Sequence, residues 1–170
     1  QEKDIELMSH IKDKKERIYA ANIFSLDRAV GRIIDSINAS KFSNNTLIIF
    51  FSDNGPVHDI DPVAGVVAAD ILNSRGNTLG LKGSKGSTYE GGIRVPAIIY
   101  YNGALEKSLS NQFFFTDDIL PTILSAAKIQ LDKDIFTGVD RWDDLITNNI
   151  QPPKNSITGN VIINDERALF

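Results

Sequence analysis

Two short stretches of this 170-residue chain carry the side chains best suited to chemistry. The first is Ser52-Asp53-Asn54-Gly55, directly after the run Thr46–Phe51. Asp53 supplies a carboxylate and Asn54 an amide oxygen, hard donors that suit Ca²⁺ or Mg²⁺. Such residues also form ordinary turns between strands. A calcium ion takes about six to eight oxygens, so the stretch is either a plain turn or part of a cation site whose other ligands lie elsewhere.

The second stretch runs from Leu81 to Pro96 and is rich in glycine, lysine and hydroxyl residues. Its backbone N–H groups, with the ammonium groups of Lys82 and Lys85, are suited to cradling an anion. The alternative is an exposed loop made soluble by its lysines. Taken together, a cation corner and an anion loop in one domain indicate a metal-assisted reaction on a phosphate or sulfate ester.

The elements that must position these stretches are those of an α/β domain. Apolar residues at steps of three and four predict a helix over about residues 15–40. The run 46–51 predicts a strand covered on both faces, and 95–101 predicts a second strand. A second helix is expected near 118–127, capped by Thr116 or Asp118. This order predicts an α/β sheet with a good share of parallel strands.

Composition excludes several classes of function. The net charge of -4, without a run of Lys and Arg on one face, provides no footprint for nucleic acid. The longest apolar stretch, Leu47–Phe51, is too short to cross a bilayer. The chain has no cysteine, which excludes disulfides, thiol nucleophiles and Cys-ligated zinc within these residues. Its two histidines, His10 and His58, leave little room for a His-based metal site.

Further motifs lie in order along the chain between about residues 19 and 142. They are Tyr19-Ala20-Ala21, Leu26-Asp27-Arg28-Ala29-Val30-Gly31, Asn44-Asn45-Thr46, Tyr89-Glu90-Gly91-Gly92-Ile93-Arg94-Val95-Pro96, Asp118-Ile119-Leu120-Pro121-Thr122 and Gly138-Val139-Asp140. With the two stretches above, they resemble the type I sulfatases, most closely the arylsulfatase B-like branch of animals. The resemblance implies an alkaline phosphatase-like sandwich of a mixed, largely parallel sheet between helices.

The resemblance also implies roles for individual residues. Asp53 and Asn54 would be two ligands of a single Ca²⁺ ion. Lys85 would be both a substrate-binding and a catalytic residue, contacting the sulfate group and stabilising negative charge as the S–O bond breaks. A structural role is implied for four other residues, which would form tight turns and a buried charge pair and take no part in catalysis: Glu90, Gly91, Gly92 and Arg94.

The chain departs from the family in lacking the nucleophile. Sulfatases use a formylglycine made from a Cys/Ser-x-Pro-x-Arg motif, which these 170 residues do not contain. We expect that motif, with the other metal ligands, before Gln1, and we expect the chain alone to be inactive. Residues 1–150 are then a partial catalytic domain, and 151–170 are the truncated start of a C-terminal region. The stretch 56–77 is longer than expected, and we interpret it as a surface loop that contains His58.

The resemblance implies a sulfuric ester hydrolase of the arylsulfatase type. One such enzyme is an N-acetylgalactosamine-4-sulfatase. Its partner would be an aryl sulfate or a sulfated glycan. Two alternatives stay open: a non-catalytic sulfatase-like protein that binds sulfated glycans, and a phosphoryl-transfer relative of the same superfamily. Two glycosylation sequons, at Asn38 and Asn44, together with the resemblance, favour a lysosomal or secreted protein.

Overall fold

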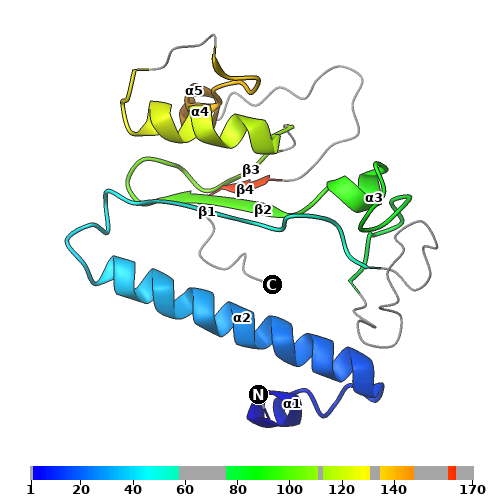
Figure 1. Ribbon diagram of the computed structural model, residues 1–170. Helices are drawn as coiled ribbons and strands as arrows, with labels where there is room; N and C mark the ends of the chain where they lie inside the picture. The colour runs from blue at the N-terminus through cyan, green and yellow to red at the C-terminus, as the bar shows by residue number, and fades with distance from the viewer. Residues whose placement is uncertain (1, 58–75, 111–112, 131–134, 148–160, 164–170) are drawn as a thin grey trace. The chain divides into compact units, whose positions relative to one another are not determined.

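The structure is a computed structural model that describes residues 2–57, 76–110, 113–130, 135–147 and 161–163 (Figure 1). Its elements are α1 (Glu2–Leu7), α2 (Lys14–Asn38), β1 (Leu47–Phe51), α3 (Glu90–Ile93), β2 (Ala97–Tyr101), β3 (Ser108–Ser110), α4 (Thr116–Ala126), α5 (Trp142–Thr147) and β4 (Val161–Ile163). The predictions made for His58 and for most of the stretch 56–77 lie outside the described residues. Only 161–163 are described in the region 151–170.

The chain divides into two compact units. Unit 1 consists of Gln1–Ser36 and Ser52–Val95, and unit 2 of Ile37–Phe51 and Pro96–Phe170. The first stretch and residues 81–95 of the second belong to unit 1, whereas the sheet belongs to unit 2. The candidate site is therefore described within unit 1.

The long helix α2 confirms the predicted periodic helix within two residues at each end. It begins after Asp13, whose Oδ1 accepts hydrogen bonds from the backbone N–H groups of Lys15 (2.8 Å) and Glu16 (2.9 Å). An aspartate in this position satisfies N–H groups that have no partner inside the helix.

Within the described part of the chain, no helix is both long enough and apolar enough to cross a membrane.

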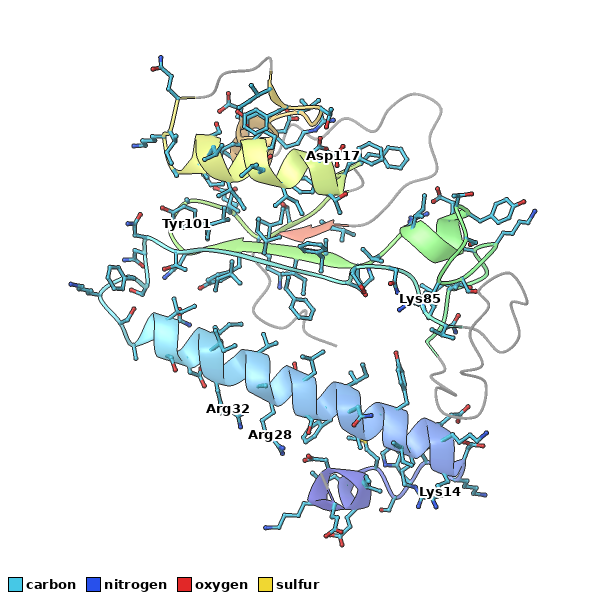
Figure 2. All side chains as sticks on the ribbon, in the orientation of Figure 1. Lys14, Arg28, Arg32, Lys85, Tyr101 and Asp117 are labelled. Carbon is cyan, nitrogen blue, oxygen red and sulfur yellow. The ribbon has the colours of Figure 1, made fainter. Side chains whose placement is uncertain are left out.

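A buried carboxylate ties α1 to α2 inside unit 1. Asp4 is only 2% exposed, and its oxygens accept hydrogen bonds from Arg28 at 2.7 and 3.0 Å. The hydroxyl of Ser25 donates a third bond, of 2.8 Å. Figure 2 shows Arg28 on the side of α2 that faces α1. The hydrogen bond from Arg28, followed by that from Ser25, lowers the pKa of Asp4 from 3.8 to about 2.

Replacing Asp4 by asparagine is expected to release α1 from α2, since the charge that Arg28 binds is lost. Because the folded pKa of Asp4 is depressed, its contribution is present in full above pH 3.8 and is lost as the pH falls through about 2. Amide hydrogen exchange of residues 2–7 measures both effects. Glu6→Gln, an exposed change on the same helix, is the control. Equal exchange in the two variants would contradict the contact.

The four-stranded sheet of unit 2 has the order β1-β2-β4-β3. β1 pairs with β2 in antiparallel orientation, β2 with β4 in parallel, and β4 with β3 in antiparallel. The predicted mixed sheet is confirmed, but antiparallel pairs outnumber the parallel one among the described strands. In the β1–β2 register, Phe51 lies opposite Ala97. The residues on either side of the segment 52–96, Phe51 and Ala97, are therefore paired in the sheet.

The core of unit 2 lies on one face of this sheet. Residues 47, 49, 97, 99 and 101 alternate with residues that point to the opposite face, as the period of two in a strand requires. Ile99 packs in a buried cluster with Leu105 and with Leu145 of α5. Figure 1 shows α4 and α5 together beside the sheet. The partly buried apolar side chains packed on this cluster are Leu47, Ile49, Ala97, Tyr101, Phe114 and Trp142.

The helix α4 and the segment after residue 137 are joined by a buried aspartate. One oxygen of Asp118 accepts the backbone N–H of Phe115 (3.0 Å), which closes the first turn of α4. The other accepts the backbone N–H of Val139 (2.8 Å). Asp118 thus takes part in capping as predicted, but from the third position inside the helix, since the residue at the N-cap is Phe115 rather than Thr116 or Asp118. Two sequence motifs, around residues 118 and 138, are brought together here.

Candidate functional site

The corner after β1 is shaped by two short side-chain bonds. The hydroxyl of Ser52 donates to the carbonyl of Asn54 (2.9 Å). The Nδ2 of Asn54 donates to the carbonyl of Gly55 (2.9 Å). Since the nitrogen end of this amide is engaged with backbone, Oδ1 is the end suited to a cation. The neighbouring carboxylate of Asp53 is exposed.

Lys85 occupies the corner of a tight turn in the second stretch. The backbone N–H of Ser87 donates to the carbonyl of Ser84 (3.0 Å), so Lys85 and Gly86 are its central residues. Gly86 has a φ of 91°, as the third position of a type II turn requires. The hydroxyl of Ser87 donates to the carbonyl of Ser84 (2.9 Å) and accepts its N–H (3.2 Å). Lys85 is exposed at the tip of this turn, and Figure 2 labels it.

Backbone hydrogen bonds join this turn to the corner within unit 1. The N–H of Lys85 donates to the carbonyl of Pro56 (2.9 Å), and the N–H of Gly55 donates to the carbonyl of Gly92 (2.8 Å). A third bond, from the N–H of Gly91 to the carbonyl of Lys82 (2.8 Å), ties α3 to the start of the turn. The backbone of Lys85 is therefore held at Pro56, which follows Asp53 by three residues in the sequence. The bonds that hold it do not depend on side chains.

Two glycines, Gly55 and Gly91, make this close approach possible. A Cβ on Gly55 would overlap the carbonyl of Gly91. A Cβ on Gly91 would in turn lie against the carbonyls of Gly83 and Lys82. Backbone thus packs directly on backbone, a contact that any larger residue prevents. We call residues 52–57 and 82–92, held in this way, the site segment.

Replacing Gly91 by alanine is expected to destabilise the protein by about 1–3 kcal/mol, because the added methyl group has no space. Chemical denaturation measures the change in the free energy of unfolding. The matched control is Gly31→Ala in α2, where a Cβ meets nothing within 4 Å. There alanine is expected to stabilise by up to about 1 kcal/mol. Changes of the same sign in the two variants would contradict the packing.

Three further charged side chains in or beside the site segment have partners nearby. The Nζ of Lys82 lies over the ring of Tyr89, 4.0 Å from its centroid. Arg94 forms an ion pair with Glu90 across 3.6 Å, and both side chains are half-buried. The predicted charge pair therefore forms, but it is half-buried rather than buried. Since Lys82 rests on an aromatic ring, Lys85 is the better candidate for contact with an anion.

The donors at the corner fit part of a hard-cation site. Asp53 and Asn54 offer one carboxylate and one amide oxygen on a turn fixed by backbone bonds. Within the described residues, no three His, Cys, Asp or Glu side chains gather closely enough to hold a metal ion. A calcium ion takes about six to eight oxygens, so a cation here needs ligands besides Asp53 and Asn54.

Comparison with known families decides the identity of the chain. The family model described as "Sulfatase" matches residues 10–129. The chain belongs to the sulfatase family. The similarity extends over the corner, the Lys85 turn and α2, and so confirms the resemblance that the motifs indicate.

Curated relatives carry the arylsulfatase name. "Arylsulfatase J" of Mus musculus is 32% identical over 147 residues, which cover 85% of this chain and 22% of the relative. "Arylsulfatase A" of Homo sapiens is 29% identical over 140 residues, which cover 82% of this chain and 25% of the relative. The sulfatase chain thus spans about a quarter or less of the length of these relatives.

Solved structures agree with the fold. "Crystal structure of Ps i-CgsB" superposes with a TM-score of 0.70 at 27% identity, covering 87% of this chain and 30% of that one. A second structure of Ps i-CgsB, in complex with k-i-k-neocarrahexaose, has a TM-score of 0.69 at 26% identity, covering 87% and 30%. The alkaline phosphatase-like α/β fold expected from the sequence is confirmed.

Proposed function

We propose that the complete protein is a sulfuric ester hydrolase and that the site segment forms part of its active site. The observation that carries the proposal is the set of backbone hydrogen bonds that link the Lys85 turn to the Asp53-Asn54 corner. It joins the backbone of the corner, which carries two hard oxygen donors, to the backbone of the turn that carries Lys85. Such preorganised charge is what the departure of a group from sulfate requires. Membership of the sulfatase family supports the same reaction.

The residues of the site segment would have distinct roles. Asp53 and Asn54 would hold one Ca²⁺ ion, since their oxygens are hard donors, and the ion would supply positive charge to the sulfate oxygens. Lys85 would donate a hydrogen bond to the sulfate group and stabilise the charge that develops as the S–O bond breaks. The nucleophile, a formylglycine from a Cys/Ser-x-Pro-x-Arg motif, would come from outside these residues. The isolated chain is therefore expected to be inactive.

The substrate class is an aryl sulfate or a sulfated glycan. The arylsulfatase names of the relatives support the first, and the resemblance to the arylsulfatase B-like branch favours an N-acetylgalactosamine-4-sulfate among the second. The complex of Ps i-CgsB with k-i-k-neocarrahexaose is consistent with a glycan.

A lysosomal or secreted location completes the proposal. Both sequon asparagines, Asn38 at the end of α2 and Asn44 before β1, are exposed and open to glycosylation. The Oδ1 of Asn44 accepts a hydrogen bond from Asn102 (2.8 Å), which leaves its Nδ2, the atom that is glycosylated, outside this bond.

Hydrolysis of matched esters tests the proposal. The complete protein, supplied with Ca²⁺, is given an aryl sulfate and the corresponding aryl phosphate. Faster release of sulfate is expected. Preferential release of phosphate would instead assign it to phosphoryl transfer. Tight binding of sulfated glycans without hydrolysis of either ester would make it a non-catalytic relative.

A further inference from the structure

We propose that Ser87 is a positioning residue for Lys85, an inference that rests on the proposed function. Its hydroxyl would not touch substrate. It would hold the turn from whose tip Lys85 reaches the sulfate group, and so set where the ammonium charge lies.

The hydroxyl of Ser87 closes the turn from within. It donates to the carbonyl of Ser84 (2.9 Å) and accepts the N–H of the same residue (3.2 Å). Ser84 is buried, 4% exposed, so water is a poor substitute for these bonds. The backbone bond from the N–H of Ser87 to the same carbonyl (3.0 Å) completes the turn. Both backbone groups of Ser84 are thus engaged by Ser87.

Glycines enclose the same hydroxyl. A Cβ on Gly83 would overlap the Oγ of Ser87, and a Cβ on Gly92 would lie 2.7 Å from it. The oxygen therefore sits where two stretches of backbone converge, with little space to rotate away. Gly92 is also the residue whose carbonyl accepts the N–H of Gly55, next to the cation corner. Ser87 thus stands at the junction of the turn, α3 and the corner.

The position of Lys85 depends on this junction because its own side chain is long and exposed. The turn holds its Cα from both sides: Pro56 accepts its N–H, and Ser87 fixes the residue before it. A small displacement of the Cα displaces the ammonium group at the end of a flexible chain. Misplacement of a catalytic group by about 1 Å is enough to cost about 100-fold in rate.

A double-mutant cycle in the complete protein tests the proposal, with kcat and KM measured for an aryl sulfate. Ser87→Ala is expected to lower kcat about 10-fold or more, with a smaller change in KM, because Lys85 acts mainly in the transition state. In a Lys85→Ala background the same change is expected to have no further effect on kcat, since the group it positions is gone. Ser36→Ala, which removes an exposed hydroxyl of α2 outside the site segment, is the matched control and should leave kcat unchanged.

Folding is checked by thermal unfolding of each variant. Where Ser87→Ala fails to fold, Ser87→Cys takes its place, since a thiol fills similar space but forms only weak hydrogen bonds. The cycle is then run unchanged. An equal loss of kcat with and without Lys85, or an unchanged kcat in the Ser87 variant alone, would overturn the positioning role. An unchanged rate in Lys85→Ala alone would overturn the role of Lys85, and this inference with it, whereas the proposed function fails only if the parent protein releases no sulfate.

Discussion

Replacing Lys85 by alanine is expected to lower kcat/KM for an aryl sulfate about 10²–10³-fold in the complete protein. The reason is that a preorganised donor, aimed at charge that develops in the transition state, is worth far more there than a surface charge in water. The stability should change little, because Lys85 is exposed and its anchoring bond to Pro56 comes from the backbone. Steady-state kinetics and thermal unfolding measure the two quantities.

The matched control for this change is Lys82→Ala in the same stretch. Lys82 is also exposed, but its ammonium group rests on the ring of Tyr89. Its removal lowers the positive charge of the site segment by the same amount, yet kcat/KM should stay within a few-fold of the parent. Equal losses in the two variants would mean that only net charge matters, and that Lys85 has no special contact.

Replacing Asp53 by asparagine is expected to remove the cation and the activity together. Asparagine keeps the size of the side chain but removes the charge, and a carboxylate is the stronger ligand for a hard cation. The affinity for Ca²⁺ should fall by more than about 100-fold, since loss of residues that merely support ligands costs about 10–100-fold. Metal analysis and calorimetric titration with Ca²⁺ follow the ion, and sulfate release follows the activity.

Asp35→Asn provides the control for this change. Asp35 is an exposed carboxylate on α2, so the substitution changes the net charge equally without touching the corner. It should leave both the bound Ca²⁺ and the rate unaltered. An Asp53→Asn protein with its full complement of metal and an unchanged rate would exclude Asp53 as a ligand.

Local patterns predicted α2, α4, β1 and β2, but not α1, α3, α5 or β3, and not how the strands pair. The apolar stripe of α2 and the run that forms β1 are properties of short stretches, so sequence periodicity reveals them. Orientation is a tertiary property. A largely parallel sheet was expected, whereas β1 and β2 are antiparallel. The corner therefore meets the segment that returns to β2, because Phe51 lies opposite Ala97.

The types of residue in the candidate site could be predicted from the sequence. The backbone contacts that hold these residues in place could not. Asp53 and Lys85 are visible as a carboxylate and a lysine in suggestive surroundings. Gly91 was expected to form a tight turn, and the structure shows in addition that its backbone packs directly on the carbonyls of Gly83 and Lys82. Ser87 was missed, although Lys-Gly between two serines is typical of a type II turn. Such a signal indicates the turn, but only the fold shows what the turn is anchored to.

The most direct test of the account is a crystal structure of the complete protein grown with Ca²⁺ and inorganic sulfate. We expect a cation with oxygens of Asp53 and Asn54 in its coordination sphere at about 2.3–2.6 Å. We also expect a sulfate oxygen within hydrogen-bond distance of the Nζ of Lys85, about 2.7–3.1 Å. A cation bound away from both corner residues, or a sulfate in the active site that Lys85 does not reach, would contradict the assignment of the site segment to catalysis.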